Sequence, residues 1–155
     1  MTAIQYLITM KRIAALIPLA FFINCLPVQA VPKVSTLTFE DVGINGCTGS
    51  AAPRGVTTWK GGKYAIWDLA GEKGTMTLNL DGSLRSFAYT KSKQMGGKGQ
   101  KVRLEGWYGR HRVELLIDYD RRIGMEARAG DGSLRIYSDV PGDSQSFRIT
   151  ALAGC

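Results

Sequence analysis

The sequence has few of the side chains from which most metal and nucleophilic sites are built. Its 155 residues include one histidine, His111, and three cysteines. Zinc and copper sites need several imidazole or thiolate ligands that converge on one ion, so this composition excludes most of them. His111 lies between Arg110 and Arg112 in a predicted turn, a basic setting that does not favour the general base of a catalytic triad. We therefore predict an exposed histidine in a basic loop, no metal site and no cofactor.

Long apolar runs are also scarce, and the one present lies near the N-terminus at Ile13–Ile23. Lys11 and Arg12 precede it, and Val28-Gln29-Ala30 follows with small residues at the positions that a signal peptidase reads. A membrane-spanning helix needs about 20 apolar residues, so this run is too short. The pattern predicts a secretory signal over residues 1–30, a mature single domain over 31–155, and a periplasmic or extracellular location with no transmembrane segment after cleavage.

Export would decide how the cysteines are used. Removal of the signal takes away Cys25 and leaves Cys47 and Cys155, and two cysteines in an exported protein most often form a disulfide. A C-x-x-C pair, which is typical of redox proteins, is absent from the sequence. We therefore predict one disulfide between Cys47 and the last residue of the chain.

The rest of the sequence has the alternation of β-strands and no convincing helical period. Met76, Leu78 and Leu80 alternate with polar residues, as expected for a half-buried strand. Short strands separated by glycine-rich turns predict a small antiparallel β-barrel, with a β-sandwich as the alternative. The predicted strands are Thr36–Val42, Gly55–Trp59, Lys63–Ala70, Thr75–Leu80, Ser83–Thr90, Lys101–Tyr108, Arg112–Asp120, Ile123–Ala129, Ser133–Asp139 and Ser146–Leu152.

The pentapeptide DGSLR occurs twice, at Asp81–Arg85 and at Asp131–Arg135. Asp-Gly between two alternating segments is a strong hairpin signal, because glycine accepts the positive φ that a tight turn requires. A calcium loop is the functional alternative, but neither copy is followed by the acidic residue that closes an EF-hand. We therefore predict that both copies are hairpin turns.

The most distinctive stretch, Tyr89–Arg112, holds seven basic side chains and one acidic side chain, Glu105. Gly96, Gly97 and Gly99 predict a mobile loop in its first part, and two aromatic residues flank its far end. Such a loop could bind an anionic surface; alternatively, the lysines keep a long hairpin loop in solution while an aromatic side chain packs in the core. The predicted binding residues are Lys93, Lys98, Lys101, Arg103, Trp107, Tyr108, Arg110 and Arg112.

Carboxylates offer the one catalytic alternative. Asp118 and Asp120 alternate with Tyr119, so both are expected on one face near the end of a strand. Paired carboxylic acids hydrolyse glycosidic bonds when they are held about 5 to 9 Å apart. Because Arg121 and Arg122 follow directly, ion pairing at a turn also explains the two acids.

Size, export, strand pattern and a terminal disulfide are together similar to small envelope proteins that bind ligands or inhibit hydrolases. That resemblance of architecture implies a non-catalytic, inhibitor-like module that binds an anionic envelope component, a small ligand or a protein. The alternatives are a small carboxylate-dependent glycan hydrolase and a structural accessory subunit. Nucleic acid is not an expected partner, because the chain is exported and carries no recognised binding motif.

Overall fold

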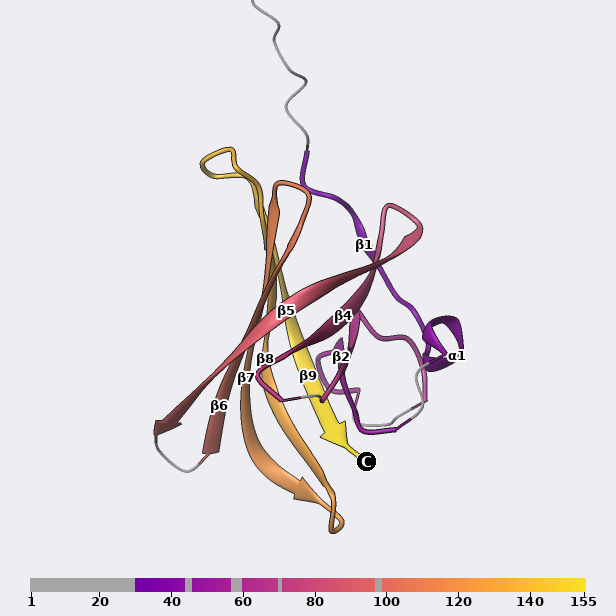
Figure 1. Ribbon diagram of the computed structural model, residues 1–155, viewed down its shortest axis with the longest axis vertical. Helices are drawn as coiled ribbons and strands as arrows, with labels where there is room; N and C mark the ends of the chain where they lie inside the picture. The colour runs from indigo at the N-terminus through magenta and orange to yellow at the C-terminus, as the bar shows by residue number, and fades with distance from the viewer. Residues whose placement is uncertain (1–29, 44–45, 57–59, 70, 97–98) are drawn as a thin grey trace, which may run out of the picture.

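The computed structural model describes residues 30–43, 46–56, 60–69, 71–96 and 99–155 (Figure 1). The predicted secretory signal therefore lies almost entirely outside the described residues and stays a prediction. Within the described residues the chain forms nine strands and one short helix. They are β1 (Val34–Ser35), α1 (Phe39–Val42), β2 (Thr48–Pro53), β3 (Ala65–Asp68), β4 (Lys73–Leu80), β5 (Ser83–Gly96), β6 (Gly99–Tyr108), β7 (His111–Ile123), β8 (Ala127–Tyr137) and β9 (Ser144–Gly154).

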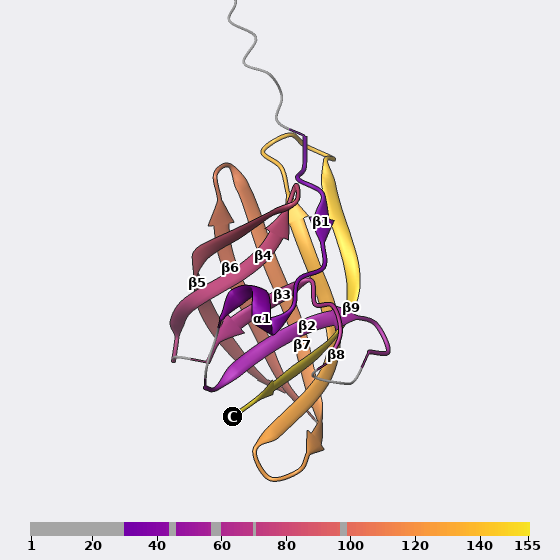
Figure 2. The same ribbon diagram turned by 90° about the vertical axis from the view of Figure 1, so that its right-hand side faces the viewer.

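Eight of these strands close into an antiparallel barrel (Figures 1 and 2). From β2 to β9 each strand pairs with the next along the chain, and β9 returns to pair with β2. The short strand β1 pairs with β4 outside this circuit. The prediction of an antiparallel barrel is confirmed, and the alternative of a sandwich is wrong.

Side chains fill the barrel interior. On β7 the inward positions Val113, Leu115 and Ile117 are buried, and on β8 Leu134 and Ile136 have no exposed surface. These side chains belong to one apolar cluster that every barrel strand joins. On β6, β7 and β8 alternation thus places one face mostly in the core and the other mostly toward solvent, and on β4 the predicted inward residues Met76, Leu78 and Leu80 are buried.

Close packing inside the barrel requires glycine at one position in particular. The indole of Trp67 on β3 lies directly over Gly49 on the neighbouring strand β2, and a Cβ atom at Gly49 would come within 2.0 Å of Trp67 Cε2. Gly49 therefore provides the space that this large, fully buried side chain occupies.

The segment predicted as the first strand, Thr36–Val42, is instead mostly α1, so that prediction is wrong. Thr38 caps the helix: its Oγ1 accepts from the Asp41 backbone N–H at 3.3 Å, and its own backbone N–H donates to Asp41 Oδ2 at 2.6 Å. The Thr38 backbone bond, followed by the Thr38 side-chain bond, lowers the pKa of Asp41. This capping box, followed by Gly43 at φ +64°, outweighs the local alternation.

Strand β2 was not predicted. The strand predicted next to it, Gly55–Trp59, is wrong at Gly55 and Val56, which are the two residues of that range that the structure describes. Gly55 is a turn residue with φ +88°, and Thr57–Trp59 lie outside the described residues. The five residues Thr48–Ala52 are all buried, on both faces of the strand. A strand that is covered on both sides and built of small residues has no alternation to detect.

The two copies of DGSLR have different structures. In the first copy Asp81 and Gly82 have φ values of +53° and +77° and form the turn between β4 and β5, as predicted. In the second copy Asp131 and Gly132 lie inside β8, opposite Asp118 and Ile117 on β7. The prediction of a second turn at this place is therefore wrong.

The turn between β7 and β8 comes earlier, at Gly124, which has φ +66° and lies between the paired residues Ile123 and Ala127. Gly132 serves a different purpose, because a Cβ atom there would lie 2.0 Å from the Leu116 carbonyl oxygen. The register of the pair shifts between Tyr119 and Arg121. Glycine at Gly132 thus permits close strand contact next to an irregularity rather than a change of chain direction.

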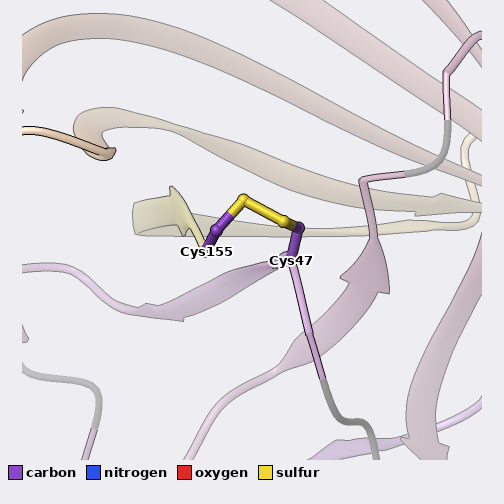
Figure 3. The surroundings of a disulfide bond; sticks show 2 residues. All are labelled: Cys47 and Cys155. Carbon is purple, nitrogen blue, oxygen red and sulfur yellow. A yellow bond between two sulfur atoms is a disulfide. The ribbon is translucent and has the colours of Figure 1, made fainter.

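Cys47 and Cys155 form a disulfide, as predicted (Figure 3). Cys47 directly precedes β2 and Cys155 directly follows β9, and these two strands form the pair that closes the barrel. The covalent bond therefore lies at one end of the closing pair, beyond the residues Thr48 and Gly154 that pair there.

Alanine at the two equivalent glycines should have unequal effects. Gly82→Ala introduces a side chain at positive φ and should lower the free energy of unfolding by about 1–2 kcal/mol. Gly132→Ala places a methyl group against the main chain of β7 and should cost more than about 3 kcal/mol. Urea denaturation of both variants measures the difference, and a Gly132→Ala cost no larger than that of Gly82→Ala would contradict the placement of the second copy inside a strand.

Removal of the disulfide should destabilise the protein strongly. The double variant Cys47→Ser/Cys155→Ser removes the bond between two residues that are 108 positions apart in the sequence. The chain-entropy relation gives a loss of about 4–5 kcal/mol in the free energy of unfolding for a loop of this size. Urea denaturation compares the variant with the oxidised wild type, whose disulfide is verified by intact mass. A loss below about 1 kcal/mol would show that the link adds little to the closure made by β2 and β9.

Candidate functional site

A groove of about 750 Å³ lies on the outer face of the barrel, over β6 to β9. We call it the outer groove. Its volume is within the range of about 300–1,000 Å³ that is typical of ligand sites. Five basic residues line it together with two acidic residues. The basic residues are Arg54, Lys101, Arg103, Arg135 and Arg148, and the acidic residues are Asp118 and Asp131.

The register of the sheet explains the shape of the outer groove. Arg103, Leu116, Ser133 and Arg148 are direct neighbours in one row across β6, β7, β8 and β9. The two long cationic side chains stand at the ends of the row, about 14 Å apart at a strand spacing of about 4.8 Å. Leu116, which is 36% exposed, and the short Ser133 lie between them and form a low floor.

Arg103 is held by acidic neighbours. Its Nη2 atom lies 2.6 Å from Glu105 Oε2 and 2.6 Å from Glu114 Oε2. The Glu114 side chain is only 7% exposed, and its other oxygen accepts from the Tyr137 hydroxyl at 3.1 Å. Arg103 therefore mainly neutralises the buried carboxylate of Glu114. Less of its positive charge remains to attract a ligand than at Lys101 or Arg148.

Asp131 is also engaged in the wall of the outer groove. Its Oδ1 atom accepts from Arg121 Nη2 and from Thr150 Oγ1, each at 3.0 Å. Thr150 Oγ1 in turn accepts from the Gly55 backbone N–H at 3.0 Å. Arg121, which does not line the groove, therefore offsets the charge of Asp131, just as Glu105 and Glu114, which also do not line it, offset the charge of Arg103.

The sequence predicted a mobile loop around the glycines in the first part of Tyr89–Arg112, followed by a strand over Lys101–Tyr108. The structure places Tyr89–Gly96 in β5 and Gly99–Tyr108 in β6, so the predicted loop is wrong at Gly96 and Gly99, and the predicted strand is part of β6. Lys101 and Arg103 line the outer groove, whereas Lys93 lines a separate hollow at one end of the barrel. Lys98 lies outside the described residues.

The other four predicted residues lie at the opposite end of β6 and β7. Trp107 is 59% exposed, whereas Tyr108 is half-buried against the core. Arg110 lies 3.6 Å from Asp139, and the Arg112 guanidinium lies 4.4 Å from the centroid of the Tyr137 ring. These residues therefore do not join Lys101 and Arg103 in one patch, because the strands that carry them separate them along the barrel.

His111 was predicted in an exposed loop, and that prediction is wrong. It is the first residue of β7 and only 4% exposed, because alternation places it on the same inward face as Val113. Its Nε2 atom is buried without a hydrogen-bond partner in the described part of the chain. Among the described residues no group of three or more histidine, cysteine, aspartate or glutamate side chains is placed to hold a metal ion.

The two candidate catalytic acids differ in their surroundings. Asp118 lines the outer groove opposite Asp131 of β8, a pairing that sequence reasoning did not find. Asp120 lies at the register shift, and its Oδ1 atom accepts from Arg121 Nε at 3.1 Å. Sequence reasoning also missed Arg54, Arg135 and Arg148, because only the register of β8, β9 and β2 shows that they share a face with Lys101.

Arg103 and Glu114 should be coupled in stability. Arg103→Gln leaves the buried Glu114 carboxylate without its cation, and we expect a loss of about 1–2 kcal/mol, between the values for exposed and buried pairs. A double-mutant cycle with Glu114→Gln should recover at least half of that loss, measured by thermal or urea unfolding. Additive effects of the two substitutions would show that Arg103 does not compensate Glu114.

The described residues contain no helix that is long and apolar enough to cross a membrane. Comparison of the chain with protein-family models, with curated proteins and with solved structures finds no match. Function must therefore be argued from the side chains that the barrel brings together, since the fold alone does not define an activity.

Proposed function

We propose that this protein is an exported, non-catalytic module that binds an anionic polymer of the cell envelope through the outer groove. The single observation that carries the proposal is the set of cations Arg54, Lys101 and Arg148, which line the groove. Among the described residues none of the three has a carboxylate within ion-pairing distance. Cations that are gathered in a hollow and form no ion pair attract anionic ligands.

The chemistry of the groove favours a polymer that carries sulfate, phosphate or carboxylate groups. Arginine side chains at Arg54 and Arg148 can bind such groups with two parallel hydrogen bonds, and Lys101 adds a point charge. The exposed Leu116 on the floor offers an apolar contact for the ring or backbone of the polymer. Lys101 on β6 and Arg148 on β9 are separated by three strand spacings, about 14 Å or more along the barrel wall, which suits repeated charges rather than one small ion.

Export is part of this proposal. A disulfide between Cys47 and Cys155 is compatible with an oxidising compartment, either the periplasm or the exterior of the cell. The predicted secretory signal would bring the chain there. An inhibitor-like function would require binding to a protein, and an acidic protein surface could bind to the same cations. Such a protein is the alternative partner for this groove.

A glycan hydrolase is the second candidate function, and the pairing of Asp118 with Asp131 in the outer groove is the observation that favours it. Two carboxylates on one face could serve as acid and base. Shortening of a bound glycan by the wild type, but not by Asp118→Asn, would support this second function. Binding without any change in polymer length supports the first.

Charge reversal in the outer groove should weaken polymer binding. Dextran sulfate is the probe and uncharged dextran the matched polymer, measured by isothermal titration calorimetry. We expect Lys101→Glu/Arg148→Glu to weaken binding of dextran sulfate at least tenfold, which corresponds to about 1.4 kcal/mol. The affinity of the wild type should also fall as salt is raised, because the groove is open to solvent and its charges are screened.

The control variant is Lys33→Glu/Lys73→Glu, which changes the net charge equally at two exposed positions that do not line the groove. This variant should keep nearly all of the affinity. Equal loss in both variants would mean that only the net charge matters and would overturn the groove as the binding site, as would equal binding of uncharged dextran.

A further inference from the structure

A second, smaller hollow of about 200 Å³ opens at one end of the barrel interior. We call it the barrel mouth. Residues from β3, β5, β6, β7, β8 and β9 line it, so it lies inside the ring of strands rather than on their outer face. It opens at the end where the chain finishes and where β7 turns into β8 (Figure 1). None of the cations of the outer groove lines it.

Two lysines occupy inward positions at the barrel mouth. Along β5, Lys91 and Lys93 continue the inward row that begins with the buried Tyr89. Their direct partners on β6 are Leu104 and Val102, both of which are buried core residues. An apolar side chain is the usual choice at such a position, and departures from the inward apolar pattern are expected at functional sites.

The charge at the barrel mouth is not balanced within the described residues. Three cations, Lys91, Lys93 and Arg128, line the mouth together with two anionic groups, the Glu126 side chain and the carboxylate of the terminal residue Cys155. No ion pair joins these groups, and Arg128 instead donates from Nη1 to the neutral Gln100 Oε1 at 2.8 Å. Burial, followed by the charge of Lys93, lowers the pKa of Lys91. The two lysines therefore repel each other, with Lys91 half-buried and Lys93 exposed.

The walls of the mouth supply both a hydrogen-bond donor and apolar surface. Burial raises the pKa of Tyr119, so its hydroxyl stays protonated and can donate to an anion. Trp67 and Leu69 form an apolar wall on the β3 side, and only β4 separates β3 from the lysines of β5. A site with cations at its rim and apolar side chains deeper inside suits a molecule with one charged end and one apolar end.

We infer that the barrel mouth binds a small amphipathic carboxylate, with its carboxylate between Lys91, Lys93 and Arg128 and its apolar part against Trp67 and Leu69. The volume limits the size of this ligand, because 200 Å³ is below the range of about 300–1,000 Å³ for drug-sized ligands. It equals about seven water molecules at about 30 Å³ each. A short acyl or aryl acid fits this space, and a long lipid chain does not.

The rim of the mouth is fixed by the covalent bond of the closing strands. Cys155 and Gly154 line the mouth, and Cys155 is bonded to Cys47 at the start of β2 (Figure 3). The disulfide therefore holds the end of β9 in place beside Trp67. A preformed rim reduces the ordering that binding of a small ligand must otherwise supply.

Titration with hexanoate, followed by heteronuclear NMR of the full folded domain, tests this inference. We expect saturable shifts at Lys93, Gln100 and Arg128 with a dissociation constant of about 1 mM or tighter. Hexan-1-ol has the chain without the charge, and acetate has the charge without the chain; both should bind at least tenfold more weakly. Lys91→Gln/Lys93→Gln should weaken hexanoate binding at least tenfold, whereas Lys101→Gln, in the outer groove, should bind it as the wild type does.

A second measurement needs no ligand. If Lys91 and Lys93 serve to bind an anion, their mutual repulsion should destabilise the ligand-free protein. The ligand-free Lys91→Gln/Lys93→Gln variant should therefore unfold at a higher temperature than the wild type. Lys33→Gln/Lys73→Gln, at exposed positions, is the matched control and should show no such gain.

Four results would overturn the inference: equal hexanoate binding by Lys91→Gln/Lys93→Gln, equal binding of hexan-1-ol, tighter binding of inorganic phosphate than of hexanoate, or a lower unfolding temperature for the lysine variant. The two proposed sites fail separately. Lys91→Gln/Lys93→Gln should keep dextran sulfate binding, and Lys101→Glu/Arg148→Glu should keep hexanoate binding.

Discussion

The pairing of β2 with β9 is the interaction on which the rest of the structure depends. It joins Thr48–Pro53 to Ile149–Gly154 and converts a meander of strands into a closed ring. Closure removes the sheet edges that a meander leaves at its first and last strands, although residues 92–96 of β5 and 144–148 of β9 extend beyond the β4 and β2 residues that pair with these strands. The disulfide from Cys47 to Cys155 lies at one end of this pair. Closure also creates an inside and an outside, and both hollows follow from that division.

Alternation along the strands distributes the charge between the two sides of the barrel wall. Lys101 and Arg103 on β6 flank the inward Val102 and therefore point to the outer groove. Lys93, the partner of Val102 on β5, points instead toward the barrel mouth. Lys93 and Lys101 are eight positions apart in one basic stretch, yet their side chains lie on opposite faces of the barrel wall.

The two proposed sites differ in how their charges are supported. In the outer groove, Glu114 and Glu105 hold Arg103 while Arg121 balances Asp131, so this wall is stabilised by ion pairs. At the barrel mouth the lysines of β5 have no such support among the described residues, and one of them is partly buried. An open, solvated groove suits a large anionic partner, whereas a confined mouth with unbalanced charge suits a small ligand that supplies the missing anion.

The sequence by itself determined the all-β class, the disulfide and the position of the first DGSLR turn, and it left the barrel and the sandwich as alternatives. These results follow from local chemistry: period-two alternation, positive φ at an Asp-Gly pair, and two cysteines left after removal of the predicted signal. The binding role of basic residues near Lys93 and Lys101 stays a prediction. The sequence misplaced α1, where the Thr38–Asp41 capping box outweighs a short alternating pattern.

Only the tertiary structure decided which residues share a site. The second DGSLR is the plainest case, since its glycine allows close contact with Leu116 and not a turn, and a pentapeptide cannot specify its neighbour across a sheet. Arg148 lies in the same row as Arg103 because the pairings of β6 with β7, β7 with β8 and β8 with β9 bring the two residues into register. His111 is buried because β7 begins one residue earlier than predicted. In each case the register between distant strands fixes the outcome, and register depends on packing of the whole barrel rather than on adjacent residues.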